Sequence, residues 1–214
     1  MEPVRYYDLG RISYETAYTL QKTLVTLLYQ QKVHQCLLLL EHDPIYTIGK
    51  AGKGSPPEGT PHIYVDRGGD ITYHGPGQLV GYPILRLQSK KISSYIYKLE
   101  NSLIALLKKY HISGSIKEGF PGVWVGTEKI SSIGIRVTNN ITYHGFALNV
   151  NTCMEAFKKI RPCNMDVTMT SMEILTGKNI SMDDIKMDYC QVFAQCFQVP
   201  VTPGDVSLLL KVVE

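Results

Sequence analysis

Two residues of the chain have the chemistry of a nucleophile and its activator, provided that the fold brings them together. Cys163 stands in "IRPCNMD", a polar segment whose proline fixes the backbone before the thiol, and Lys129 opens the run "KISSIG", where a strand could point the ammonium inward. A thiol with a pKa near 8.5 is only about 3% ionised at pH 7, so full ionisation costs on the order of 2 kcal/mol. An ammonium about 4 Å away contributes roughly 4 kcal/mol at an effective dielectric of about 20, which is sufficient. Taken singly, a structural thiol and a solvated lysine are the more common roles.

A glycine-rich segment, "DRGGDITYHGPGQ" at 66–78, has the features of a ligand-binding loop. Its four glycines allow backbone amides to approach a ligand closely. Tyr73 and His74 add flat rings with hydrogen-bonding tips beside those amides. A surface turn with Arg67 in an ion pair is the plainer alternative, but the density of chemistry favours a binding site.

The pentapeptide "ITYHG" occurs twice, at 71–75 and at 141–145. The flanking sequences do not align at that offset, whereas a duplicated unit would repeat its hydrophobic pattern throughout. We therefore interpret the two copies as two walls of one site, contributed by separate strands.

Known cofactor motifs fail on inspection. "GKAGKGS" lacks the first glycine and the final Ser or Thr of a phosphate-binding loop, and "GPGQLVG" places Val80 where the dinucleotide fingerprint needs glycine. The six histidines show no zinc-ligand spacing. The sequence therefore predicts no nucleotide, metal or other cofactor.

Composition restricts the class of protein. Forty-four per cent of the 214 residues are hydrophobic, which suits one domain over 1–214, and a net charge of +3 without long charged runs argues against nucleic-acid binding. The five cysteines form no C-x-x-C pair, and the chain shows neither a signal peptide nor an apolar run of membrane-spanning length. We expect a cytoplasmic protein. Apart from Cys163, the cysteines either have apolar neighbours or give no signal.

The elements that must position these residues follow from periodicity and turn signals. Helical spacing predicts helices over 14–32, with Ser13 as N-cap, and over 92–110. Capping-box spacing places further helix starts at Thr152 and Thr170, and Ser181 precedes another helix. Strands grouped in the middle, with helices at both ends, predict an α+β domain. The expected strands are "HQCLLLLEH", "IYTIG", the two halves of "ITYHGPGQLVGYPILRL", the hairpin "GVWVGTEKISSIGIRV", and "ITYHGFALNV".

Five ordered segments, spread from about Tyr7 to Leu175, resemble the motifs of the octanoyltransferase (LipB) family. They are "EHDPIYTIGK", "DRGGDITYHGPGQLVGYPI", "PGVWVGTEKISSIGIRV", "YHGFALNV" and "IRPCNMDVTMTSM". The resemblance implies a single domain of the lipoate ligase and biotin ligase type, with a mixed β-sheet flanked by helices. It also implies transfer of an octanoyl group from acyl carrier protein to a lysine of a lipoyl domain, in lipoate biosynthesis.

The same resemblance assigns roles to residues. Cys163 would form the acyl thioester, and Lys129 would lower the pKa of the thiol and shuttle protons. His144 is an auxiliary candidate, and Asn164 replaces the glycine that usually follows the nucleophile. The expected acyl-binding residues are Arg67, Gly68, Gly69, Asp70, Ile71, Thr72, Tyr73, His74, Ser132, Ile133, Gly134, Gly145, Phe146 and Ala147.

The implied partners are acyl carrier protein as donor, and the lipoyl domains of 2-oxoacid dehydrogenase E2 subunits and the glycine cleavage H protein as acceptors. A monomer is expected. Three alternatives stay open: an ATP-dependent lipoate-protein ligase, a cysteine-dependent acyl thioesterase, and a non-catalytic acyl-binding scaffold.

Overall fold

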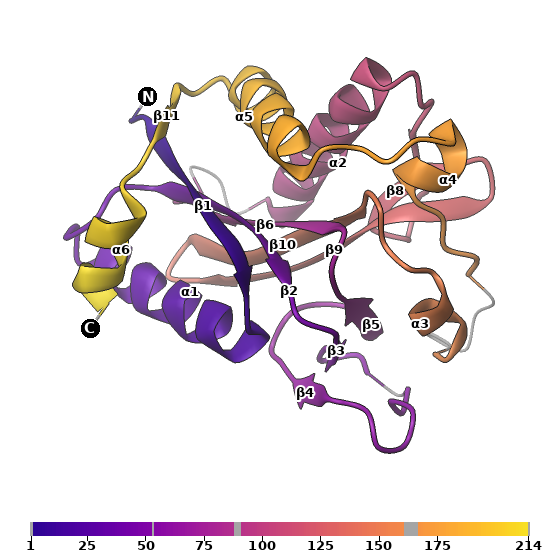
Figure 1. Ribbon diagram of the computed structural model, residues 1–214. Helices are drawn as coiled ribbons and strands as arrows, with labels where there is room; N and C mark the ends of the chain where they lie inside the picture. Colours follow the sequence, from indigo (N-terminus) through magenta and orange to yellow (C-terminus); the bar gives the residue numbers. More distant parts are fainter. Residues whose placement is uncertain (1, 53, 88–90, 161–166, 214) are drawn as a thin grey trace.

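An eight-stranded mixed sheet forms the centre of the protein in a computed structural model that describes residues 2–52, 54–87, 91–160 and 167–213 (Figure 1). The strand order is β11-β1-β2-β6-β10-β9-β8-β7. β1 pairs in parallel with β11 and β2, and the other neighbours are antiparallel. The strands are β1 Val4–Ile12, β2 Cys36–His42, β6 Gln78–Ile84, β7 Ser115–Ile116, β8 Gly122–Val125, β9 Glu128–Thr138, β10 Ile141–Asn149 and β11 Val201–Pro203.

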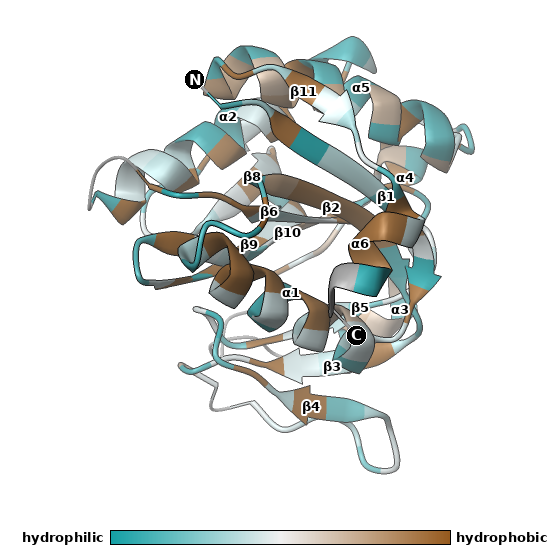
Figure 2. Cartoon of the chain, turned by 90° about the vertical axis from the view of Figure 1, so that its left-hand side faces the viewer, coloured by the Kyte–Doolittle hydropathy of each residue, from teal (hydrophilic) through white to brown (hydrophobic). Residues whose placement is uncertain are grey.

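Helices cover both faces of this sheet. α2 (Ile92–Lys109) and α5 (Met182–Phe197) lie on one face, and α1 (Tyr14–Tyr29) and α6 (Val206–Val213) lie on the other (Figure 1). Alternate residues of β2 therefore enter different cores: Leu37 and Leu39 join α2 and α5, whereas Leu38 and Leu40 join α1. Burial on both faces explains why "CLLLL" is an unbroken apolar run. Figure 2 shows hydrophobic residues concentrated where the strands lie between the helical layers.

A second, three-stranded sheet lies beside one end of the main sheet, with the order β4-β3-β5 (Figure 1). Its strands are β3 Ile45–Ile48, β4 His62–Tyr64 and β5 Ile71–His74. Two short helices, α3 (Glu155–Lys158) and α4 (Met172–Thr176), follow β10 in the chain. Tyr73 packs between Tyr46 and Phe157, in a small apolar cluster that joins this sheet to α3.

The two long predicted helices and the predicted hairpin are confirmed. The Ser13 side chain caps α1 by accepting from the N–H of Thr16, and Ser181 caps α5 in the same way. The two capping boxes were wrong. Thr152 donates its hydroxyl to the carbonyl of Gly77 instead, and Ser171 is the residue that caps α4, one position after Thr170.

The prediction missed the strands that form one edge of the main sheet. β1 and β11 come from opposite ends of the chain and pair in parallel, with Val4 opposite Val201. The chain therefore does not place helices alone at its two ends. Half-polar strands such as β1, "VRYYDLGRI", have little periodicity of their own. None of the described helices is long and apolar enough to cross a membrane.

Candidate active site

A cavity of about 630 Å³ opens where the two sheets meet. Its wall comes from the glycine-rich loop and β5, from β9 and β10, from the first turns of α2, and from the chain just before α4. The residues of the predicted site that line the cavity are Arg67, Gly68, Gly69, Asp70, Ile71, Thr72, His74, Lys129, Ser132, Ile133, Gly134, His144, Gly145, Phe146 and Ala147. Tyr73 is not among the lining residues, because its ring faces the apolar cluster with Phe157.

Both copies of "ITYHG" reach this cavity, as the repeat predicts. The first copy forms β5 of the small sheet, and the second begins β10 of the main sheet. Ile71 and His74 line one side, and His144 and Gly145 line the other. The repeat thus marks two walls from two different sheets.

Two glycines allow the loop and strands to approach each other. Gly134 stands opposite Gly145 in the β9–β10 pair, and the N–H of Gly68 donates to the carbonyl of Ile135 at 3.0 Å. A Cβ on Gly134 would lie 2.9 Å from the Gly68 carbonyl oxygen, and one on Gly145 would lie 2.0 Å from that of Gly81. The glycines of "SSIG" and "YHGF" are therefore required by backbone contact.

Arg67 places a buried positive charge in the cavity wall. Its guanidinium donates to the carbonyl of Thr47 at 2.7 Å, to the Thr47 hydroxyl at 2.8 Å, and to the carbonyl of Gly68 at 2.9 Å. Burial lowers the pKa of Arg67, although an arginine of this kind stays protonated. These acceptors are neutral, and the negative charge of Asp70 in the same wall favours the charged guanidinium. A buried guanidinium is a group that stabilises a carbonyl oxygen or an oxyanion of a ligand.

His144 anchors the loop from the other side. Its backbone has φ +54°, its N–H donates to Gln21 Oε1 at 2.7 Å, and its Nε2 lies 2.9 Å from Asp66 Oδ1. Asp66 also accepts from the hydroxyls of Tyr18, at 2.8 Å, and Tyr143. Burial lowers the pKa of His144 to about 4, so the ring is neutral at pH 7 and its Nε2–H is the donor. Burial opposes ionisation of Asp66, but these hydrogen bonds prevail and lower its pKa to about 2.

His74 has its tautomer fixed by a chain of amide groups. Gln78 Nε2 donates to the carbonyl of Tyr73 and to Asn149 Oδ1, at 3.2 and 2.9 Å, which makes Gln78 Oε1 the acceptor for His74 Nδ1–H at 2.8 Å. Asn149 Nδ2 in turn donates to the carbonyl of Thr170 at 3.0 Å. Within the described part of the chain no hydrogen bond engages Nε2 of His74, so that atom is left as an acceptor. Burial lowers the pKa of His74 well below 6.5.

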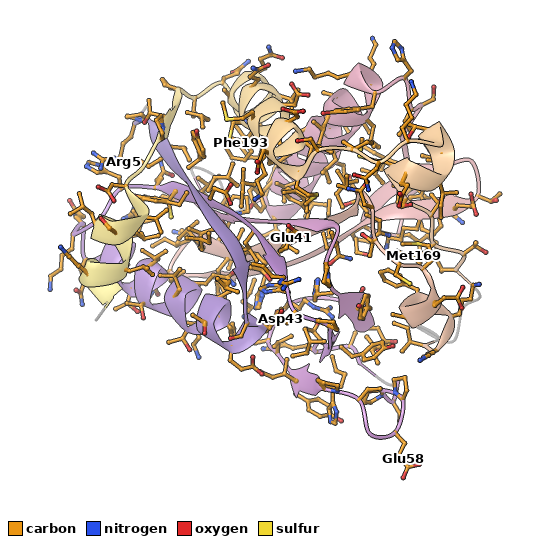
Figure 3. The ribbon with its side chains drawn as sticks, viewed as in Figure 1. Arg5, Glu41, Asp43, Glu58, Met169 and Phe193 are labelled. Atoms are coloured by element: carbon orange, nitrogen blue, oxygen red, sulfur yellow. The ribbon has the colours of Figure 1, made fainter. Side chains whose placement is uncertain are left out.

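Lys129 lines the cavity from β9, and its backbone holds the chain that approaches α4. Its N–H donates to the carbonyl of Thr168 at 2.9 Å, and its carbonyl accepts from the N–H of Thr170 at 3.0 Å. Met169, labelled in Figure 3, lies between these two bonds and also lines the cavity. The ammonium nitrogen lies 5.4 Å from the centroid of the Trp124 ring, within range of a cation–π contact.

Cys163 and Asn164 lie outside the described residues. The described chain meets the cavity on both sides of that gap, with Phe157 before it and Val167 after it. The site therefore places Lys129 and the two flanks of the cysteine motif at one cavity.

Several residues that line or support the site were missed from the sequence, among them Gln78, Asn149, Trp124 and Glu100. The first two are amides within apolar strands, which was a usable signal because a buried amide needs hydrogen-bond partners. Glu100 interrupts the apolar face of a helix, four residues after Ile96, and that signal was also available.

Comparison with known proteins defines the family. A family model described as the lipoyl protein ligase A/B catalytic domain matches residues 13–194. An octanoyltransferase of Pelobacter propionicus is 39% identical, with 84% of this chain and 88% of the relative covered. An octanoyltransferase of Caldicellulosiruptor saccharolyticus is 42% identical, with 95% and 94% covered. The chain belongs to the octanoyltransferase family. The LipB motifs identified from the sequence therefore point to the correct family.

Solved structures show the fold of this octanoyltransferase. A lipoate-protein ligase A bound with ATP superposes with a TM-score of 0.80 at 13% identity, covering 100% of this chain and 94% of that chain. A biotin protein ligase from Aquifex aeolicus, in complex with biotin and ATP, gives a TM-score of 0.58 at 14% identity, covering 91% and 70%. The predicted α+β class and the mixed sheet of the lipoate ligase type are confirmed.

Proposed function

We propose that this octanoyltransferase, which serves lipoate biosynthesis, transfers the octanoyl group through a thioester on Cys163. The donor is octanoyl-acyl carrier protein and the acceptor is a lysine of a lipoyl domain. The main support is the convergence of Lys129, the buried Arg67 and the flanks of the cysteine motif on one cavity. Residues 1–214 would act as one cytoplasmic, monomeric catalytic domain without a cofactor.

The cavity suits an acyl chain. Ile71, Ile133, Phe146 and Ala147 give its wall an apolar surface, and its volume of about 630 Å³ is in the range of small-molecule sites. Burying six or so methylenes at about 0.8 kcal/mol each contributes roughly 5 kcal/mol, which favours octanoyl over acetyl strongly. A change of one methylene alters the rate only about 10- to 200-fold, so finer choice requires a closed end.

In the first half-reaction the Cys163 thiolate attacks the carbonyl carbon of the donor thioester. A bond forms between the Cys163 sulfur and the acyl carbon, and the bond to the carrier sulfur breaks. The carrier thiolate takes the proton of Lys129, which becomes a neutral amine. Arg67, which lines the same cavity, would stabilise the charge that develops on the carbonyl oxygen.

In the second half-reaction the acceptor lysine attacks the acyl-enzyme. With a reference pKa near 10.4, its ammonium must first release one proton to solvent, at a cost of roughly 4 to 5 kcal/mol near pH 7. The neutral Lys129 takes a proton from the attacking amine, an amide bond forms, and Cys163 leaves as a thiolate. The Lys129 ammonium and the Cys163 thiolate are restored. His74 Nε2 is a second acceptor in the same cavity, whereas both ring nitrogens of His144 already have partners.

Intact mass spectrometry after incubation with octanoyl-acyl carrier protein, without acceptor, tests the proposal. We expect one octanoyl adduct on the native chain and on Cys153→Ala, which removes an exposed cysteine, and no adduct on Cys163→Ala. A lipoyl domain should then discharge the adduct.

Two results would overturn the proposal in different ways. Modification of the lipoyl domain only with ATP and free acid would indicate a ligase. Release of free octanoate without any lipoyl domain would indicate a thioesterase.

A further inference from the structure

Glu100 is a carboxylate on the buried side of α2. Its side chain belongs to a residue that is 5% exposed, and helical spacing places it with Ile96 and Leu103 on the face that meets the sheet. A buried carboxylate is unfavourable unless it is hydrogen-bonded or paired with a charge. Its partners therefore show what it does.

Glu100 and Lys129 contact the same residue. Glu100 Oε1 accepts from the N–H of Gly122 at 3.1 Å. Lys129 approaches the Cα of Gly122 so closely that a Cβ there would lie 2.6 Å from Lys129 Cε and 3.3 Å from its Nζ. The carboxylate of α2 and the ammonium of β9 are thus separated by the backbone of one glycine.

Glu100 is buried and Lys129 is half-buried, so the two charges are screened less than fully exposed charges would be. Burial raises the pKa of Glu100, and the Gly122 N–H and the positive charge of Lys129 both oppose that rise. The same coupling acts in reverse on Lys129, because an interaction that favours the carboxylate must equally favour the ammonium.

We propose that Glu100 is the positioning residue for Lys129, holding its side chain beside Gly122 in the ammonium form. The proposal rests on the function assigned to Lys129 above. An ammonium supports the Cys163 thiolate before acyl transfer, and the amine left afterwards is a stronger base when its pKa is high.

Other charged groups also lie near Lys129, and their contacts differ from those of Glu100. Lys117 shares the Trp124 ring with Lys129, with its ammonium 4.7 Å from the ring centroid, and adds a second positive charge. Asp70 lines the same cavity, but its carboxylate accepts from the N–H of Ile71 at 2.7 Å. Among the described carboxylates, Glu100 shares the contact residue Gly122 with Lys129.

The test measures the pKa of Lys129. The titration is monitored by NMR of the lysine ε-carbon, in protein labelled with 13C-lysine. Lys129→Arg assigns the signal. Glu100→Gln keeps an acceptor for the Gly122 N–H, and we expect it to lower the pKa of Lys129 by about one unit. Glu128→Gln is the matched control, because adjacent strand residues point to opposite faces of the sheet, and we expect a shift less than about a quarter as large.

Activity separates this inference from the proposed function. The NMR test measures the pKa of Lys129 directly and does not depend on activity. If that pKa shifts in Glu100→Gln but the native chain forms no octanoyl adduct, the charge coupling is supported and the thioester mechanism is overturned. An adduct with an unchanged Lys129 pKa in Glu100→Gln, or equal shifts in both variants, would overturn the role of Glu100 alone. In an active enzyme, the alkaline limb of the kcat/KM profile should move to lower pH in Glu100→Gln and stay in place in Glu128→Gln.

Discussion

Nε2 of His144 lies 2.9 Å from Oδ1 of Asp66, which joins strand β10 to the first residue of the glycine-rich segment. The hydroxyls of Tyr18 and Tyr143 meet the same carboxylate. The Asp66 carboxylate therefore links α1, β10 and the glycine-rich segment through hydrogen bonds. Arg67 is the next residue of that segment. The cavity wall around Arg67 owes its position to this carboxylate.

Asp66→Asn should destabilise the protein. The carboxylate accepts three hydrogen bonds, and bonds to a charged group contribute about 1.5 to 3 kcal/mol each, but its side chain is 29% exposed and solvent screening reduces the total. We expect a loss of about 2 kcal/mol, measured by urea unfolding. Asp43→Asn is the control, because its ion pair with Arg11 is exposed and should contribute little. Equal losses in the two variants would contradict the anchoring role.

Stability should fall when the pH drops below about 6.5. Burial lowers the pKa of His42 and of His144 to about 4, and that of His74 well below 6.5, so the unfolded chain binds more protons in this window. The stabilisation is complete above pH 6.5 and is lost as the pH falls toward 4, by up to about 1.4 kcal/mol per pH unit for each histidine. Asp66 acts in a lower window, from its unfolded pKa of 3.8 down to about 2.

Urea midpoints measured from pH 7.5 to pH 4.5 check this slope. His34→Gln is the control, because this exposed histidine pairs with Glu2 at the surface and its removal should leave the slope unchanged. A native protein whose stability is flat between pH 7 and pH 5 would contradict the burial of these rings as neutral groups.

Gln78→Leu should change the tautomer of His74. The substitution removes the acceptor of His74 Nδ1–H and the donor to Asn149, so His74 loses the group that fixes its proton. We expect 15N NMR to show a mixture of tautomers, and discharge of the acyl-enzyme to slow roughly tenfold or more. Gln78→Glu keeps the acceptor and should retain the Nδ1–H form. An unchanged His74 spectrum in Gln78→Leu would rule out the amide chain as the cause.

Gly145→Ala should be far more damaging than a glycine change at an open turn. Its Cβ would lie 2.0 Å from the Gly81 carbonyl oxygen, and a strand backbone cannot yield without breaking the β6–β10 pairing. Gly59→Ala meets no atom within 4 Å, and its φ of +72° costs about 1 to 2 kcal/mol. Thermal unfolding should separate the two, with Gly145→Ala showing the larger loss. Comparable melting temperatures would contradict the close contact.

Local rules predicted those parts of the fold that local sequence determines. Ser13 and Ser181 cap helices because a serine side chain satisfies N–H groups within its own turn. The pairing of β1 with β11 depends on residues at the two ends of the chain, and no periodicity within either strand encodes it.

The candidate site shows the same division. The repeated "ITYHG" and the glycines pointed to the cavity because their residue types are unusual for plain strands. The contact of Glu100 with Gly122, and the order of the Gln78–Asn149 chain, depend on the packing of elements that are distant in sequence. Sequence could flag these polar residues as buried, but only the fold supplies their partners.

The two walls of the cavity belong to different sheets, since β5 and β10 share no strand ladder in the described structure. The distance between the two walls is set by side-chain hydrogen bonds, such as that of Asp66 with His144, and by the backbone hydrogen bond from Gly68 to Ile135. The size of the bound molecule can therefore change through a few substitutions, while both sheets keep their register. The scaffold, whose fold a lipoate-protein ligase A and a biotin protein ligase share, is thus distinct from the contacts that set the opening of the cavity in this protein.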